Sequence, residues 1–368
     1  MAPTLGPTRN PLICTVSVKF TSTSELPKDG LCDIIFYESF YIKNKPTGWT
    51  DPGLDHFLEL ATKLRATSVG ASFSPNKDKL FADALSGSLN AAVDRLRSLG
   101  VSHFGTLSLY GKYTMPAKLL QCLKLLQWFP VMKCGLMKLC SAITEPSFFV
   151  ALTHVPFADR KRRDCRILPM TMLDFPAVPP RRQMKYAISI KEALRNLQWT
   201  QSHKWDFTWM AISFSMRGHM YAPANISGDD SAYKLFRPCK NFTAPRHDFD
   251  VQPTSRCPSS HGEWTYRFES DVVGEYTYDT ARGLMMVFDS EISIRKKICE
   301  AKAAYPAVPF GVAAYDVDYD SVASDCPSMQ IGFGAYRRVK ALRRLNEFME
   351  KRFTDASRLQ ECLVLALL

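Results

Sequence analysis

The segment from Gly283 to Asp320 constrains the fold more than any other part of the chain. Two apolar, strand-like stretches, GLMMVFDS and FGVAAYDVDYDS, flank the helix-like stretch SIRKKICEAKAAYP. A short buried strand, an amphipathic crossover helix and a second buried strand are typical of one βα unit of a parallel sheet. The second strand ends in a group of acids, and α/β barrels keep their sites at the carboxyl ends of strands. The segment therefore predicts an α/β fold with a candidate site after its second strand.

Strand-like and helix-like patterns alternate over most of the chain, which favours α/β over α+β. The length of 368 residues fits one large barrel as well as two ordinary domains, so length alone does not choose between them. The predicted strands include 34–41, 101–109 and 207–214, and the predicted helices are 54–64, 80–99, 116–126, 188–197 and 293–303.

Two regions interrupt the alternation. Residues 127–147 are apolar but poorly periodic, so we interpret them as a divergent segment. Residues 219–282 are rich in Pro, Ser, Asp and aromatic residues. Long insertions in compact domains usually form functional loops or subdomains, so this one is predicted to decorate the mouth of the barrel.

Eleven cysteines are spread along the chain without a CxxC pair, which argues against a zinc ribbon or a redox pair. Spread cysteines together with the glycosylation sequons at Asn225 and Asn241 favour the secretory pathway and disulfides. The alternative is that the cysteines are buried thiols of a cytosolic protein. No signal peptide is visible at the N-terminus, and the apolar C-terminal CLVLALL is too short to span a bilayer.

The net charge is +11, and part of the excess lies in clusters at 160–163, 181–182, 337–338 and 343–344. Such clusters attract polyanions, although they are more often solvated faces. The chain lacks an RNA-binding signature, so nucleic-acid binding is not favoured. Zinc-type His/Glu spacing, a P-loop and a G-x-S-x-G elbow are missing as well, so the sequence predicts no metal site and no cofactor.

Several segments resemble glycoside hydrolase family 18, the chitinases and chitinase-like lectins. FDSEISIRKK (288–297) is similar to the family's "YDDPESIRAK", and GVAAYDVDYDS (311–321) is similar to its last barrel strand, "GVMVWSLDLDDF". Weaker similarity links CTVSVKF, LCDIIFYESFYI, TSVGASFS and GVSHFGTLSLYGKYT to the first four strands, and MAISFSMRGHMYAP to a sixth or seventh strand with its loop. The resemblance implies that residues 1–368 form a single TIM-type (β/α)8 barrel domain, and it implies a chitin-like glycan as ligand.

The resemblance also locates the family's catalytic pattern, D-x-x-D-x-D-x-E on the fourth strand. In the family the final Glu protonates the glycosidic oxygen, and the substrate's N-acetyl group acts as nucleophile. Here the four positions are His103, Thr106, Ser108 and Tyr110. Because a phenol has a pKa of about 10, Tyr110 is a poor proton donor. The catalytic centre is therefore interpreted as lost, and Tyr110 is kept as a ligand-binding candidate.

Other acids follow the last predicted strand. Asp316 and Asp318 are predicted to share one face of it, and Asp320 would join them if the strand continued that far. Barrel topology would bring Glu38 and Asp289 near the mouth as well. These acids could support hydrolysis, but such residues often cap a helix or pair with arginine instead.

Aromatic residues supply the other ligand-binding candidates. Tyr315 replaces the tryptophan that forms the floor under the sugar in the family. A tyrosine there could stack on a sugar or could fill the barrel interior. Trp209 and Tyr221, with Trp264 and Tyr266, could be sugar platforms or core residues.

The resemblance implies a disulfide between Cys14 and Cys32, a pair that family members often link. We predict two further disulfides from the positions of the cysteines. Cys299 and Cys326 bracket the last strand, and Cys239 and Cys257 both lie within the insertion. The cysteines predicted to be left unpaired are Cys134, Cys140 and Cys362.

Together these observations predict a secreted, chitinase-like pseudoenzyme that binds carbohydrate or acts in another extracellular interaction. One alternative is an active glycoside hydrolase that uses unrecognised acids. Another is a polyanion-binding protein that acts through its basic clusters.

Overall fold

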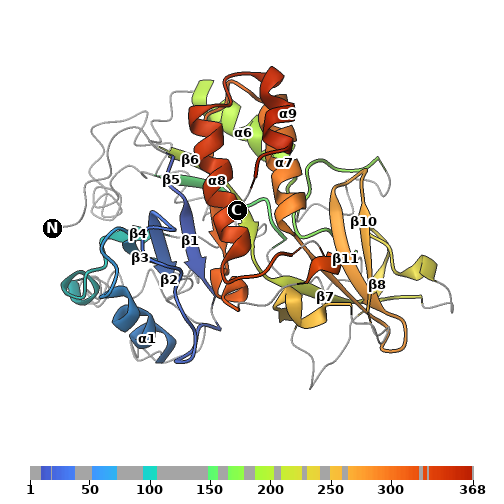
Figure 1. The fold of residues 1–368 in the computed structure, drawn as a ribbon, viewed down its shortest axis with the longest axis horizontal. Helices are drawn as coiled ribbons and strands as arrows, with labels where there is room; N and C mark the ends of the chain where they lie inside the picture. The colour runs from blue at the N-terminus through green and yellow to red at the C-terminus, as the bar shows by residue number, and fades with distance from the viewer. Residues whose placement is uncertain are drawn as a thin grey trace, which may run out of the picture.

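A computed structural model describes the fold of most of the chain. The described residues are 10–17, 19–37, 52–72, 94–105, 148–155, 165–177, 187–202, 209–225, 230–240, 249–258, 264–322, 326–329 and 331–366. Two sheets lie side by side, with a layer of helices against the first (Figure 1).

The first sheet is curled and consists of seven parallel strands, which confirms the predicted α/β barrel-type fold. We call it the barrel sheet. Its order is β4-β3-β2-β1-β13-β6-β5, so the first and last parts of the chain meet where β1 pairs with β13. The strands are β1 (Ile13–Val16), β2 (Ile34–Tyr37), β3 (Ser68–Ser72), β4 (His103–Gly105), β5 (Phe148–Ala151), β6 (Trp209–Ser215) and β13 (Gly311–Tyr315). Residues 106–147, which include the predicted divergent segment, separate β4 from β5 and lie outside the described residues.

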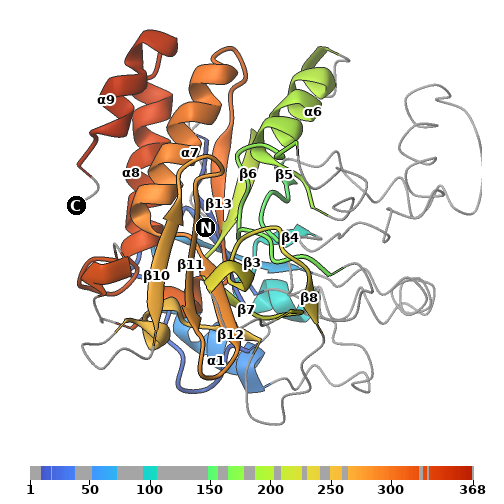
Figure 2. The ribbon, with the colours of Figure 1, turned by 90° about the vertical axis from the view of Figure 1, so that its right-hand side faces the viewer.

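Helices cover the outer face of this sheet, as Figure 2 shows for α6 to α9. They are α1 (Pro52–Ala61), α6 (Ile190–Ser202), α7 (Glu291–Ala304), α8 (Arg337–Lys351) and α9 (Leu359–Leu363). The helices predicted over 54–64, 188–197 and 293–303 are thus confirmed, whereas 80–93 and 116–126 lie outside the described residues. Among the described helices, none combines the length and the apolar character needed to cross a bilayer.

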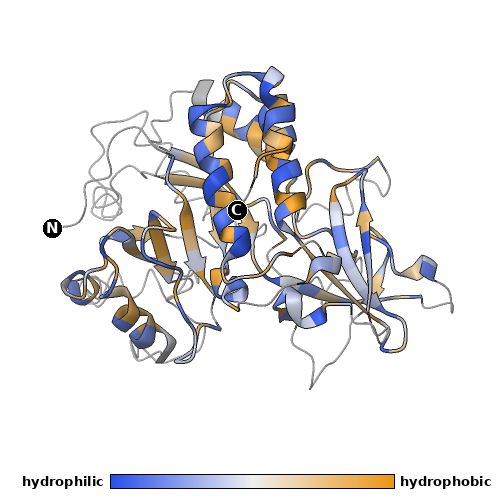
Figure 3. Cartoon of the chain, in the orientation of Figure 1, coloured by the Kyte–Doolittle hydropathy of each residue, from blue (hydrophilic) through white to orange (hydrophobic). Residues whose placement is uncertain are grey.

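Alternation along each strand sorts side chains into two layers. Val16, Tyr37 and Phe214 belong to the large outer core, which also contains the apolar stripes of the helices. Figure 3 shows these stripes as orange on one side of helices that are blue on the other. The other strand positions point into the curled sheet and form a smaller inner core of Ile13, Ile34, Phe36, Ala211, Ala313 and Tyr315.

A glycine makes room inside the barrel sheet. Gly70 lies between Phe36 on β2 and His103 on β4 in the strand register. A Cβ atom at position 70 would come within 2.5 Å of the Phe36 ring. Because glycine leaves this space open, the rings of Phe36 and His103 approach to 6.4 Å between centroids.

The second sheet is antiparallel along its main path, β10-β11-β12-β7-β8, with β9 paired to β7. We call it the antiparallel sheet. Its strands are β7 (Gly218–Pro223), β8 (Cys239–Lys240), β9 (Asp250–Val251), β10 (Thr265–Glu269), β11 (Gly274–Asp279) and β12 (Leu284–Phe288). The region predicted as an insertion, 219–282, therefore supplies most of this sheet. Apolar clusters cover both of its faces.

One prediction about this region is wrong. The stretch GLMMVFDS was assigned to the same parallel sheet as GVAAY, yet β12 pairs antiparallel with β11 and β7. All five residues of β12 are buried, and a fully buried strand has the same apolar pattern in either kind of sheet. The helix that follows does cross to the barrel sheet. It begins at a capping box, in which the Ser290 hydroxyl accepts from the backbone N–H groups of Ile292 and Ser293.

Four disulfides pair all of the cysteines in the described part of the chain. Cys14 bonds to Cys32, as expected. The other two predicted pairings are wrong, because Cys239 bonds to Cys165, Cys257 to Cys326 and Cys299 to Cys362. Cys362 is therefore not left over: α9 packs on α7, which brings it to Cys299. Cys134 and Cys140 lie outside the described residues.

Candidate functional site

Polar side chains gather where the strands of the barrel sheet end. We call this edge the mouth. Strand β13 stops at Tyr315, and Asp316 adopts the left-handed backbone conformation (φ 59°, ψ 45°) before the 3₁₀ helix η4 (Val317–Asp320). The prediction that Asp316 and Asp318 share a strand face is therefore wrong, because the chain leaves the extended conformation at Asp316. A non-glycine residue in this conformation is uncommon and re-aims the side chains that follow.

Asp316 is buried among polar groups at the ends of β6 and β1. The Ser215 hydroxyl, at the end of β6, donates to its carboxylate at 2.6 Å. The Arg217 Nε atom lies 3.1 Å from the same carboxylate oxygen, and the Asp316 N–H donates to Thr15 Oγ1 at 3.2 Å. These contacts compensate the charge that the fold buries at this position.

Asp318 reaches across to the end of β1. The backbone N–H and the hydroxyl of Ser17 each donate to one of its carboxylate oxygens, both at 2.7 Å. Burial raises the pKa of Asp318 to about 6, helped by the neighbouring charge of Asp316 and opposed by the Ser17 hydrogen bonds. Asp318 therefore changes its charge closer to neutral pH than an exposed aspartate does.

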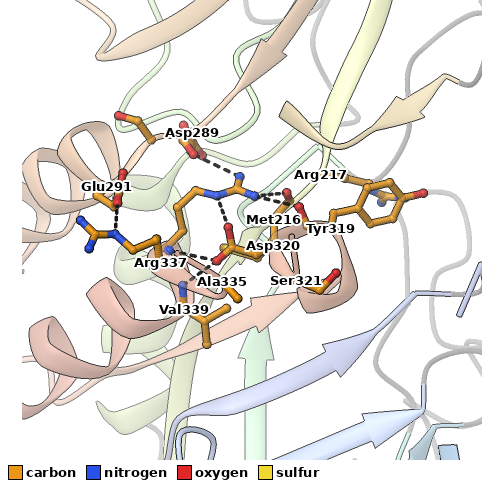
Figure 4. A network of polar contacts seen from close by, with 12 residues as sticks. Met216, Arg217, Asp289, Glu291, Tyr319, Asp320, Ser321, Ala335, Arg337 and Val339 are labelled. Carbon is orange, nitrogen blue, oxygen red and sulfur yellow. Dashed lines mark hydrogen bonds and ion pairs between the residues drawn. The ribbon is translucent and has the colours of Figure 1, made fainter. Parts of the chain in front are cut away.

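Asp320 has a structural role. Its carboxylate accepts from the backbone N–H groups of Arg338 and Val339, at the start of α8, and from Arg338 Nε at 2.8 Å. The Arg338 guanidinium is buried and also donates to the carbonyl oxygens of Met216, Asp289 and Tyr319 (Figure 4). The interpretation that such an acid caps a helix and pairs with arginine holds for Asp320.

The antiparallel sheet contributes a second charged group to the mouth. Arg217 lies between Asp316 and Asp250, with Nη1 at 3.3 Å from the Asp250 carboxylate. His219 Nδ1 lies 2.6 Å from the other oxygen of Asp250, and His219 Nε2 is 2.7 Å from the Val155 carbonyl. Burial opposes the charge of Asp250, but Arg217 and His219 hold its pKa below the usual range.

Arg217, His219 and Asp250 were missed in the sequence. The first two lie two and four residues beyond a strand end, a signal that could have identified them. Asp250 offered no such signal, because it lies in the middle of the predicted insertion.

Tyr315 lies in the inner core of the barrel sheet and is only 1% exposed. Its ring centroid is 4.7 Å from that of His154, a buried residue just beyond the end of β5. In this structure Tyr315 fills the barrel interior and offers no open surface for stacking. Tyr319, on η4, is partly exposed at the mouth and was not singled out in the sequence.

Several other candidates lie away from the mouth. Trp209 begins β6 and stacks on Phe148 at 4.7 Å, at the opposite end of the strands. Tyr221 is buried in one core of the antiparallel sheet and Trp264 in the other. Two further candidates make polar contacts within the fold. Tyr266 donates a hydrogen bond to Glu275, and Asp289 forms an ion pair with the buried Lys297.

The remaining candidates are only partly covered by the structure. His103 points into the barrel sheet, between the rings of Phe36 and Phe148. Asn225 is exposed just after β7. The predicted residues outside the described part of the chain are Glu38, Thr106, Ser108, Tyr110 and Asn241.

The basic cluster at 337–344 lies on α8 and is largely paired. Arg337 Nε is 3.2 Å from Glu291, and Arg338 is buried against Asp320. Arg343 contacts both Asp33 and Glu347, whereas the exposed Arg344 donates to the Ala366 carbonyl. Most of this positive charge therefore stabilises the fold. The clusters at 160–163 and 181–182 lie outside the described residues.

Comparison with known proteins identifies the architecture. No family model matches the sequence, and no curated protein matches it significantly. Among solved structures, human YKL-39 matches with a TM-score of 0.61 at 14% identity, over 91% of this chain and 99% of that one. It is described as a pseudo-chitinase with retained chitooligosaccharide-binding properties. The protein has the chitinase fold.

Two chitinase structures give similar matches. The immunomodulatory chitinase of Trichuris suis aligns with a TM-score of 0.56 at 12% identity, over 96% of this chain and 100% of that one. The second catalytic domain of the Ostrinia furnacalis Group II chitinase aligns with a TM-score of 0.59 at 12% identity, over 92% and 96%. The predicted resemblance to glycoside hydrolase family 18 is thus confirmed at the level of the fold.

Within the chitinase fold, β4 takes the position of the fourth strand. Strands β1 to β4 follow one another in sequence and in space, in parallel register. The segment that the sequence assigned to the catalytic pattern therefore begins on the fourth strand, at His103.

Proposed function

We propose that this protein is a chitinase-like pseudoenzyme that binds a chitin-like oligosaccharide at the mouth of the barrel sheet without hydrolysing it. One observation carries the proposal. The fourth strand and the residues that follow it in the sequence read HFGTLSLY (103–110), with no carboxylate at any of the eight positions. A hydrolase that acts through a protonated carboxyl needs that group at the carboxyl end of a barrel strand.

Two of the described acids at the mouth, Asp316 and Asp320, support the same conclusion. Asp316 is held by Ser215 and Arg217, and Asp320 by Arg338. Both carboxylates already contact donors from within the fold, and each has an arginine as its ionic partner. Their contacts are those of structural acids that compensate buried charge.

The ligand class and the compartment rest on supporting observations. The pseudo-chitinase YKL-39, with which this chain shares its fold, is described as binding chitooligosaccharides. Four disulfides are typical of proteins in oxidising compartments, which favours an extracellular protein.

The test measures binding and turnover on one preparation. Isothermal titration with chitotetraose should show binding, while product analysis of the same mixture should show no shorter oligomers. Tyr110→Glu should not create turnover, because the neighbouring acids of the pattern are also missing. Hydrolysis by the unmodified protein at a rate above that of a heat-denatured control would contradict the proposal.

Active glycoside hydrolysis is a second candidate, and Asp318 favours it. A carboxyl with a pKa of about 6 resembles the tuned acids of glycosidases. If Asp318 is the proton donor, any turnover should survive Tyr110→Phe and disappear in Asp318→Asn. The opposite pattern would exclude Asp318 and point back to position 110.

A further inference from the structure

His154 has a buried ring nitrogen that the proposed function does not use. The residue is 3% exposed and lies beyond the end of β5, on the inward side of the barrel sheet, where its ring meets Tyr315. Its Nδ1 atom is 2.8 Å from the Ser213 hydroxyl. Its Nε2 atom has no hydrogen-bond partner within the described part of the chain.

The surroundings of Ser213 decide where the imidazole carries its proton. The Thr153 N–H donates to Ser213 Oγ at 2.9 Å, so this oxygen already accepts one hydrogen bond. The Ser213 hydroxyl hydrogen is then best placed to donate to His154 Nδ1. Nδ1 becomes the acceptor, and the proton lies on Nε2. Burial, with the charges of Arg217 and His219, holds the pKa of His154 well below its usual value, so the ring is neutral.

Thr171 lies directly opposite His154. The two residues form an antiparallel bridge, in which the Val155 N–H donates to the Met170 carbonyl at 2.7 Å. This pattern makes His154 and Thr171 a non-hydrogen-bonded pair, whose side chains lie close together on the same side. Thr171 is fully buried, and its hydroxyl also has no partner among the described residues.

We propose that His154 and Thr171 together bind one acceptor oxygen, supplied by a glycan hydroxyl or by a water molecule, beneath the mouth of the barrel sheet. The His154 Nε2–H donates to this oxygen, and the Thr171 hydroxyl either donates to it or accepts from it. Buried polar groups almost always have a hydrogen-bond partner. Two adjacent buried groups that both lack one therefore indicate a partner that they share. The glycan source rests on the proposed function, whereas the water source does not.

The first measurement tests the site without any glycan. Long-range ¹⁵N–¹H correlation spectra of ¹⁵N-histidine-labelled protein at pH 7 should show His154 neutral and protonated at Nε2. Thr171→Val is nearly isosteric and removes only the hydroxyl, so it should shift the Nε2 signal. Thr277→Val is the matched control, because its buried hydroxyl also lacks a partner among the described residues but lies on β11 of the antiparallel sheet. It should leave the signal unchanged.

The second measurement separates the two sources of the oxygen. If a glycan supplies it, chitotetraose should move the His154 Nε2 signal, and Thr171→Val should bind the sugar about fivefold more weakly than Thr277→Val does. If the signal stays fixed, whether or not the sugar binds, the occupant is water. Binding of chitotetraose to the unmodified protein tests the proposed function separately. Protonation at Nδ1, or equal spectra for Thr171→Val and Thr277→Val, would overturn the inference.

Discussion

The barrel sheet and the antiparallel sheet differ in where they place their polar residues. Inside the barrel sheet, the positions near the amino ends of the strands are apolar, such as Ile13 and Ala211. Polar residues such as Thr15 and Ser215 follow at the carboxyl ends. The antiparallel sheet has apolar clusters on both faces. Its buried acid Glu275 accepts from Ser290 and Tyr266, beside the start of α7.

This difference shows how the mouth is assembled. The barrel sheet supplies acids at one edge, and the antiparallel sheet supplies Asp250 and His219 to the same edge. Neither sheet completes the charged network alone, because Arg217 lies at the junction between β6 and β7. The relative position of the two sheets therefore determines the electrostatics of the candidate site.

The largest expected effect comes from breaking the contact between the two sheets. Arg338 joins Met216 of the β6–β7 junction, Asp289 of the β12–α7 junction and Asp320. Arg338→Met should lower the free energy of unfolding by about 3–5 kcal/mol, because it leaves a buried carboxylate without its cation. Urea denaturation measures the change. The exposed Arg344→Met on the same helix should change stability by less than about 0.5 kcal/mol, and equal losses in the two variants would contradict this role of Arg338.

The disulfides provide the next comparison. Cys165–Cys239 closes a loop of 74 residues in the antiparallel sheet, whereas Cys14–Cys32 closes one of 18 residues in the barrel sheet. Chain entropy predicts that replacing both cysteines by alanine costs about 4 kcal/mol for the long loop and about 3 kcal/mol for the short one. Thermal or urea unfolding of the two double variants gives the order. A larger loss from removing Cys14–Cys32 would show that loop length does not set the difference.

Asp318 makes the stability of the barrel mouth depend on pH. Its pKa in the fold is about 6, above the value of about 4 in an unfolded chain. The fold therefore favours protonated Asp318, which adds to the free energy of unfolding. This added stability is complete below about pH 4 and is lost as the pH rises through 6. The loss amounts to about 3 kcal/mol. In the Asp318→Asn variant, the free energy of unfolding should no longer fall by this amount between pH 4 and pH 7. The exposed Asp55→Asn variant should keep the fall. Identical curves for the two variants would refute the assignment.

A glycan attached next to the antiparallel sheet is expected to have the smallest effect on stability. Asn225 is exposed just after β7, where a bulky sugar costs little. Secreted from eukaryotic cells, the protein should lose mass on treatment with an N-glycosidase, and Asn225→Gln should reduce that loss by one glycan. Unmodified peptides covering both Asn225 and Asn241 would remove this support for a secretory protein.

The sequence alone determined the main architecture and predicted the loss of the catalytic acids. Short apolar runs identified β2, β6 and β13, and apolar residues at helical spacing identified α1, α6 and α7, because both patterns report which side chains are buried. The order of the motifs indicated the chitinase fold, and the run from His103 to Tyr110 contains no carboxylate.

Only the tertiary structure decided which segments meet. Periodicity reports burial but not the partner strand, so β12 was assigned to the wrong sheet. Disulfide partners depend on how loops and helices pack, which is why Cys239, Cys257 and Cys299 have other partners than the spacing suggested. The left-handed turn at Asp316 ended a strand that alternation would have continued, and the packing of the two sheets brought Asp250 to the mouth. These features arise from contacts between residues far apart in the chain, which a local pattern does not encode.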